Sequence, residues 1–445
     1  MLESKSLSIL LEALEHLDHG FAQLPLYQPA TDLAALKQGL FEVAERMHDN
    51  FPYPHPFYIG QMLKPPHAIA RLAYMLSIYI NPNNHALDGG RASSAMEKEA
   101  VAEIATMFGW QTHLGHLCGG GTLANFEALW IAKSLRPGQT IVASEQSHYT
   151  HRRLSQVLDV PFQAIPCNRQ AQMDIAALEK VLQTESVGTV VATTGTTGTG
   201  SVDPVPEILN LREKYGFRLH IDAAYGGYFR LANNLSPKTR LAFDLITQAD
   251  SIVIDPHKHG LQPYGCGCVL FKDPQVGVLY KHDSPYTYFS SADLHLGEIS
   301  LECSRAGSSA VALWATQRLF PLVENGEFAR NLEKCRQAAL ILFSRIQQED
   351  SLVALMEPEL DIVVWCQKGK SASQISEMTQ RTFHIAGTKG LHLAIAKFPR
   401  SILESYLPGI TWDEDNIACF RSCVMKPEHL DWLDQIWTIF KESTV

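Results

Sequence analysis

The sequence predicts an α/β protein in which a mostly parallel sheet, flanked by helices, is followed by a small C-terminal α+β domain. Between about residues 95 and 275, short apolar strand patterns alternate with helix patterns, the order typical of a parallel sheet. After about residue 300 the order changes to a long helical run near 308–347, then three strand patterns and a last amphipathic helix. A chain of 445 residues has room for two or three domains.

Residues 1–80 have helical patterns, interrupted at 51–67, where five prolines force an extended path. In the alternating region one helix is expected over 93–109, with Ser at its start and Gly at its end, and another over 121–136. The strand patterns of this region are, in chain order, 140–145, 187–195, 217–224, 251–256 and 267–272.

The C-terminal strand patterns lie near 360–367, 391–398 and 417–425, and a final helix is expected over 428–443. We expect the sheet here to be antiparallel, with helices on one face. The predicted parts are therefore an N-terminal helical segment (1–80), a large domain (81–327) and a small α+β domain (328–445).

Composition excludes several classes of protein. The formal net charge of −10 argues against non-specific nucleic-acid binding, and no apolar run approaches the ~18 residues that a membrane span needs. The first 20 residues predict an amphipathic helix and not a signal peptide. The nine cysteines are scattered without a C-x-x-C pair, so we expect reduced thiols and a cytoplasmic protein. Cys266 and Cys268 lack a second ligand pair at zinc spacing, and we expect no metal.

Four features follow predicted strands or open helices, where parallel sheets bind ligands. The first, CGGGTLANFEAL, leads from three glycines into a helix at Gly121 and Thr122. Free backbone amides there can bind an anion, although a plain glycine-rich turn is an equal reading. The second is His148, which can stack on a flat ring or move a proton, and which is alone more simply a surface histidine.

The third feature is HIDAAYGG, in which Asp222 ends an apolar strand and Ala224 leaves room for a ring. TTGTTGTG, residues 193–200, ends another strand and contains no dinucleotide fingerprint. The fourth is Lys258, between His257 and His259, immediately after the apolar strand at 251–254. A lysine amine with a depressed pKa is a nucleophile for aldehydes. An anion site, a stacking ring, a carboxylate and such a lysine together are what pyridoxal 5'-phosphate requires.

These residues, in this order, resemble the group II pyridoxal-phosphate decarboxylases, which include aromatic amino acid, glutamate and archaeal tyrosine/aspartate decarboxylases. The resemblance implies the aspartate aminotransferase-like fold, type I of the pyridoxal-phosphate-dependent transferases. It implies that Lys258 forms the Schiff base, that Asp222 partners the pyridine nitrogen and that His148 stacks on the ring. Further residues implied to hold the cofactor are Gly121, Thr122, Thr197, Ala224 and His257.

The same resemblance implies a homodimer with active sites at the interface and the N-terminal segment packed on the partner. Proton return is expected from a tyrosine of SPYTYFSS, Tyr288 rather than Tyr286. Arg305 and Arg400 are expected near the substrate, where a structural salt bridge is an equal reading for either. The side-chain selectors expected are Gln61, Met62, Asn84, His85 and Arg91.

We therefore expect decarboxylation of an L-amino acid to the amine and CO2, with the substrate open. The alternatives are a carbon–carbon lyase of the sphingosine-phosphate-lyase type, which needs a second phosphate pocket that we cannot identify, and, less favoured, an aminotransferase. A catalytically silent scaffold is least favoured, because it has no chemical need for Lys258, Asp222 and His148 together.

Overall fold

The computed structural model describes residues 3–25, 27, 30–86, 88–281, 296 and 299–444. Its centre is a seven-stranded sheet in the order β1-β7-β6-β5-β4-β2-β3. All its strands run parallel except β7, which is antiparallel to both of its neighbours. The strands are β1 (Leu114–Cys118), β2 (Thr140–Ser144), β3 (Phe162–Ile165), β4 (Val187–Thr193), β5 (Arg218–Asp222), β6 (Ser251–Ile254) and β7 (Gly267–Phe271).

Helices cover both faces of this sheet because its strands alternate apolar side chains between two cores. Val142, Val190 and Ile252 face one core, whereas Ile141, Val191 and Val253 face the other side. The helices of this region are α4 (Arg91–Met107), α5 (Gly121–Leu135), α6 (Thr150–Val157), α7 (Ile175–Thr184), α8 (Val205–Tyr215), α9 (Pro237–Leu245) and α10 (Gly307–Leu319). The predicted α/β class is confirmed.

The predicted helical run over 308–347 is wrong in one respect, because it is two helices. The helix α10 ends at Leu319 and α11 (Glu327–Gln347) begins after a break that contains Pro321 and Gly326. A proline cannot continue the hydrogen bonding of a helix interior, which accounts for the break. We propose the start of α11 as the boundary between the large and small domains.

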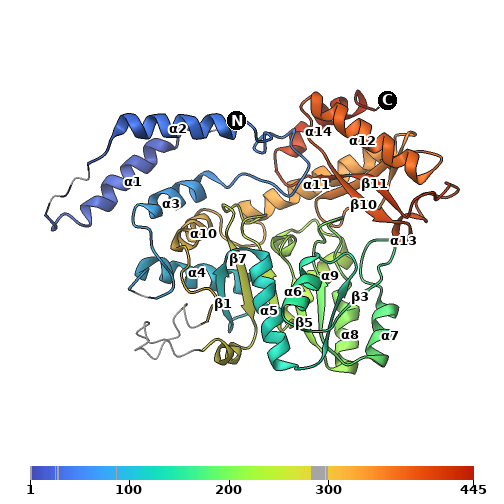
Figure 1. The fold of residues 1–445 in the computed structure, drawn as a ribbon, viewed down its shortest axis with the longest axis horizontal. Coiled ribbons are helices and arrows are strands. Elements are labelled where there is room, and N and C mark those ends of the chain that lie inside the picture. The colour runs from blue at the N-terminus through green and yellow to red at the C-terminus, as the bar shows by residue number, and fades with distance from the viewer. Residues whose placement is uncertain are drawn as a thin grey trace.

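The second sheet is antiparallel, in the order β10-β11-β9-β8. Its strands are β8 (Leu352–Ala354), β9 (Ile362–Gln367), β10 (Ala394–Pro399) and β11 (Asn416–Cys423), with α12 (Ala372–Thr388), α13 (Arg400–Leu403) and α14 (His429–Lys441) nearby. Figure 1 shows this small domain above the part of the large domain that contains β3, β5 and α9. The predicted antiparallel pairing is present, and the short β8 was missed along with β1 and β3.

The N-terminal helices α1 (Leu7–His19) and α2 (Leu33–Met47) project from one side of the molecule, whereas α3 (Ala68–Ile78) packs on α10 (Figure 1). The helix α2 has no buried residue, and Leu33, Leu40 and Phe41 are about two-thirds or more exposed. In the described part of the chain, no helix has the length and apolar character needed to cross a bilayer.

Candidate active site

A cavity of about 860 Å3 opens at the carboxyl ends of the parallel strands. The strands contribute residues at or shortly after their carboxyl ends, since parallel strands end at the same edge of a sheet. The cavity is lined after β1 by Gly119–Gly121, after β2 by His148, at and after the end of β4 by Thr193 and Thr197, at and after the end of β5 by Asp222 and Ala224, and after β6 by Asp255, His257 and Lys258. All eight residues predicted to hold the cofactor therefore line this one cavity.

The glycine-rich turn is shaped for an anion by close packing. Gly120 has φ +142°, a backbone conformation that residues with side chains rarely adopt. A Cβ on Gly121 would lie 2.6 Å from Asp255 Oδ2. The turn can therefore lie this close to residues 255–258 only because position 121 has no side chain. No side chain caps the start of α5 within the described residues, so its first amides are available to a ligand.

Lys258 is paired in this state of the molecule. Its Nζ lies 3.0 Å from Asp255 Oδ2, and the carboxylate is almost completely buried. His257 Nε2 lies 3.5 Å from the same oxygen, while His257 Nδ1 donates to the carbonyl of Cys266 at 2.9 Å. Burial lowers the pKa of His257. Asp255 was not among the predicted site residues, although it lies only three positions before Lys258.

Asp222 is held as a carboxylate by a second histidine. His151 Nε2 donates to Asp222 Oδ2 at 2.8 Å, and the Ala224 amide donates to Oδ1 at 3.1 Å. Burial alone would raise the pKa of Asp222, but the His151 hydrogen bond and the charges of His151 and Lys258 outweigh it and hold the pKa below its usual range. This contact of His151 was not predicted from the sequence.

His148 lies on the cavity wall, with its Nδ1 2.7 Å from Thr150 Oγ1. Burial lowers the pKa of His148, so its ring is biased toward the neutral form. A neutral imidazole can lie against a flat ring or accept a proton.

The residues predicted to bind substrate do not line this cavity. Arg400 is half exposed and pairs with Glu404 at 2.6 Å, and Gln61 Oε1 accepts a hydrogen bond from Arg421 at 3.0 Å. His85 follows a turn in which its amide donates to Asn83 Oδ1. Arg305 is buried in an ion pair with Glu97. Tyr288 and Tyr286 lie outside the described residues.

Arg421 on β11 is a cation that sequence reasoning missed. It is 4% exposed, and its Nε and Nη2 have no hydrogen-bond partner within the described residues. Arg421 lies near Tyr225, which lines the cavity. Burial raises the pKa of Tyr225, and the positive charge of Arg421 lowers it. The signal was present in the sequence, because an arginine in the apolar strand IACFRSCVM is costly to bury unless something pairs with it.

The cavity fits a flat phosphorylated aldehyde. The amides at the start of α5 suit a phosphate, Lys258 is the only lysine among the described residues of its lining, and the Asp222 carboxylate suits a protonated ring nitrogen. Asp255 Oδ1 is buried with no partner in the described structure, so the lining retains hydrogen-bonding capacity.

Comparison with known proteins gives an independent result. The model of the pyridoxal-dependent decarboxylase conserved domain matches residues 55–368. An L-tyrosine decarboxylase of Enterococcus faecium is 28% identical, over 73% of this chain and 71% of that protein. An L-aspartate decarboxylase of Thermococcus kodakarensis is 27% identical, over 84% of this chain and 96% of that protein.

Solved structures show the same fold. Mouse CSAD superposes with a TM-score of 0.79 at 19% identity, over 100% of this chain and 92% of that chain. Oryza sativa TDC with PLP and tryptamine superposes with a TM-score of 0.79 at 15% identity, over 100% of this chain and 99% of that chain.

A pH dependence follows from His220, which lies on β5 beneath the cavity. Its ring is hydrogen-bonded to Ser251 and Asn125, and burial lowers its pKa to about 3. Above pH ~6.5 the ring is neutral in both the folded and unfolded states; below it the unfolded chain takes up a proton that the folded chain refuses. The stability that His220 contributes is therefore complete above pH ~6.5 and is lost as the pH falls toward 3.

We expect the stability advantage of the wild type over His220→Gln to shrink by roughly 2 kcal/mol between pH 6 and pH 4. Urea unfolding at several pH values measures it. The exposed His384→Gln is the matched control and should show a constant difference. A constant difference for His220→Gln as well would contradict the assignment of a neutral buried ring.

Proposed function

The chain belongs to the pyridoxal-dependent decarboxylase family, and we propose that it removes the α-carboxylate of an L-amino acid at the cavity that contains Lys258. Pyridoxal 5'-phosphate is its cofactor. The observation that carries the site assignment is the convergence of Lys258, Asp222, His148 and the glycine-rich turn on one cavity. The proposed products are the amine and CO2.

The proposed cofactor contacts divide the cavity wall into three parts. The amides at Gly121 and Thr122, with the Thr197 side chain, would hold the phosphate, and Lys258 Nζ would bond covalently to the aldehyde carbon. Asp222 would face the ring nitrogen, with Ala224 and His148 beside the ring. When bound, the cofactor supplies an electron sink for the pair released from the breaking Cα–carboxylate bond.

The ability of the cofactor to accept electrons depends on the negative charge of Asp222. A carboxylate keeps a neighbouring ring nitrogen protonated, and a protonated ring withdraws electrons more strongly. His151 supports this role because its 2.8 Å hydrogen bond holds the Asp222 pKa below its usual range. His151 therefore acts through Asp222 and is a positioning residue.

Lys258 must be released from Asp255 to act as a nucleophile. The 3.0 Å ion pair stabilises the charged ammonium, whereas the neutral amine attacks an aldehyde. His257 Nε2 lies 3.5 Å from the same Asp255 oxygen, so one carboxylate holds both side chains beside the cavity. We keep Tyr288 as the proposed source of the proton that returns to Cα.

Arg421 does not line the cavity in this structure but lies near Tyr225, which does. We propose it, in place of Arg305 and Arg400, as the ligand of the substrate carboxylate. Its two unpartnered nitrogens lie on one side of a planar group that binds carboxylates through paired hydrogen bonds. A buried cation without an acidic partner among the described residues also has the most to gain from an anionic ligand. Gln61, which accepts from Arg421, would orient the guanidinium.

The exposed apolar surface of α1 and α2 supports a homodimer. These helices expose Leu7, Ile9, Leu11, Leu33, Leu36, Leu40, Phe41, Val43 and Met47. An apolar surface of this extent is typical of a protein interface. We propose that a second copy covers it.

The function is tested by loading the protein with pyridoxal 5'-phosphate and offering acidic, aromatic, basic and sulfinated L-amino acids. We expect equal amounts of CO2 and amine from one class. Formation of a keto acid without CO2 would mean transamination, and a bound cofactor with every amino acid unchanged would favour a carbon–carbon lyase.

We expect Lys258→Ala to release CO2 at least 1,000-fold more slowly, because no other lysine lines the cavity within the part of the chain that the structure describes. Lys272→Ala, a lysine whose Nζ donates to the Thr247 carbonyl, is the control and should keep its rate. Wild-type turnover by Lys258→Ala would refute the assignment.

We expect Arg421→Met to raise KM for the amino acid at least tenfold, because one charge-assisted carboxylate contact contributes about 1.5–3 kcal/mol. Arg400→Met should leave KM unchanged, since the ion pair that the described residues give Arg400 is a local one with Glu404. An unchanged KM for Arg421→Met would exclude the proposed contact.

Analytical ultracentrifugation tests the dimer. We expect the wild type to sediment as a dimer and the double variant Leu40→Glu/Phe41→Glu to shift toward the monomer, because the charges would be buried without partners. A monomeric wild type would contradict the proposal.

A further inference from the structure

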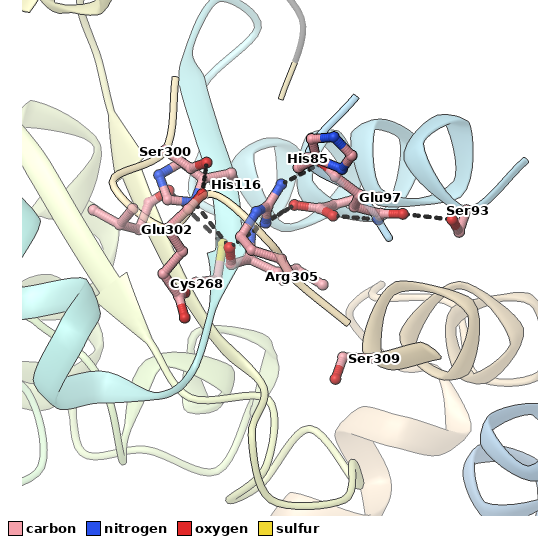
Figure 2. Close-up of polar contacts among 12 residues, drawn as sticks. His85, Ser93, Glu97, His116, Cys268, Ser300, Glu302, Arg305 and Ser309 are labelled. Atoms are coloured by element: carbon pink, nitrogen blue, oxygen red, sulfur yellow. Dashed lines mark hydrogen bonds and ion pairs between the residues drawn. The ribbon is translucent and has the colours of Figure 1, made fainter. Parts of the chain in front are cut away.

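A buried ion pair outside the cavity joins α4 to the segment before α10. Glu97 Oε1 lies 2.7 Å from Arg305 Nη1, and the two residues are 1% and 8% exposed. Figure 2 shows the pair at the centre of a polar cluster formed by segments far apart in the sequence. Neither side chain lines the cavity.

Both members of the pair bind the backbone of Leu117. The Leu117 amide donates to Glu97 Oε1 at 2.9 Å, and Arg305 Nη1 donates to the Leu117 carbonyl at 2.6 Å. Leu117 belongs to β1, which pairs with β7 and lies at the edge of the sheet formed by the described strands. The ion pair therefore satisfies backbone groups that a further strand would otherwise bind.

The glycine-rich turn begins two residues after Leu117. Because both peptide groups of Leu117 are fixed, so is the direction in which the chain enters Gly119–Gly121. Glu302, three residues before Arg305, also accepts the Gly119 amide at 3.2 Å. The segment that contains Glu302 and Arg305 thus binds the backbone of Leu117, just before Cys118, and of Gly119, just after it.

The same pair fixes a third segment. Asn84 Nδ2 donates to Glu97 Oε2 at 2.6 Å, and Arg305 Nη2 donates to the Asn84 carbonyl at 3.3 Å. The Asn84 amide donates to the Arg305 carbonyl at 3.0 Å, and the Arg305 amide to Asn83 Oδ1 at 3.0 Å. One ion pair therefore ties together the strand that enters the turn, residues 83–84 and the segment before α10.

We propose that Glu97 and Arg305 are positioning residues that set the geometry of the glycine-rich turn for the cofactor phosphate. This inference rests on the proposed function, which places the phosphate at that turn. Backbone amides bind an anion well only when they converge on one point, and a glycine-rich turn has little intrinsic rigidity to keep them there. The Leu117 hydrogen bonds supply the rigidity from outside the cavity.

A positioning role and a purely electrostatic role predict opposite effects on phosphate binding when the charge of Glu97 is removed. Glu97→Gln would leave Arg305 as an uncompensated cation near the turn, and a simple field effect would tighten phosphate binding. If the pair acts by positioning, the same change loosens the turn and weakens phosphate binding. The sign of the effect therefore separates the two explanations.

The experiment compares the affinities for pyridoxal 5'-phosphate and for pyridoxal, which lacks the phosphate, by absorbance titration. The proteins are the wild type, Glu97→Gln, the milder Arg305→Lys, which keeps the charge pair, and Asp250→Asn. Asp250 is a matched control because it also accepts a strand amide, from Leu219 at 2.7 Å, and pairs with an arginine, but at the amino end of β5.

We expect the wild type to prefer the phosphorylated form, and Glu97→Gln and Arg305→Lys to lose at least tenfold of that preference. Asp250→Asn should keep it. If Glu97→Gln does not fold, Arg305→Lys carries the test, with circular dichroism as the measure of folding. Tighter binding of the phosphorylated form by Glu97→Gln, or equal losses for both ligands, would overturn the positioning role. A wild type without any preference would instead overturn the proposed phosphate site itself.

Discussion

The parallel pairing of β4, β5 and β6 is the constraint on which the site depends. Thr193 pairs with Asp222, and Asp222 pairs with Val253, so the ends of three strands lie level at one edge of the sheet. Groups separated by dozens of residues in the chain then face one cavity. Helices on both faces bury the rest of each strand, which makes this edge the accessible part of an otherwise apolar layer.

Most of the buried charged side chains in and around the site are paired with a group of opposite charge. Lys258 is paired with Asp255, Asp222 with His151, and Arg305 with Glu97. The pairing is costly to disturb, because removing one partner leaves the other charged in a medium of low dielectric constant. Arg421 is the exception, since its side-chain partner in the described part of the chain is the neutral Gln61. Its incomplete hydrogen bonding is the reason that we propose it as the ligand of the substrate carboxylate.

Prediction from the sequence succeeded where the signal was local. The strands β2, β4, β5, β6 and β7 were recognised because each is short, mostly apolar and ends in, or is followed by, a polar residue. The strand β1 escaped notice because Gly115 and His116 interrupt its apolar pattern, and β3 because the polar Gln163 interrupts a run of four residues. The helical run over 308–347 failed at Pro321, a break that propensity alone should have indicated.

By itself, the sequence determined the fold class and the identity of the reactive groups at the strand ends, because periodicity and motif spacing are properties of neighbouring residues. Only the tertiary structure decided their partners. His151 meets Asp222 across 71 positions of the chain, Arg305 meets Glu97 across 208, and Arg421 meets Gln61 across 360. No local pattern encodes such contacts, since they arise from the packing of whole elements. The roles of the histidines and arginines therefore became interpretable only once the chain was folded.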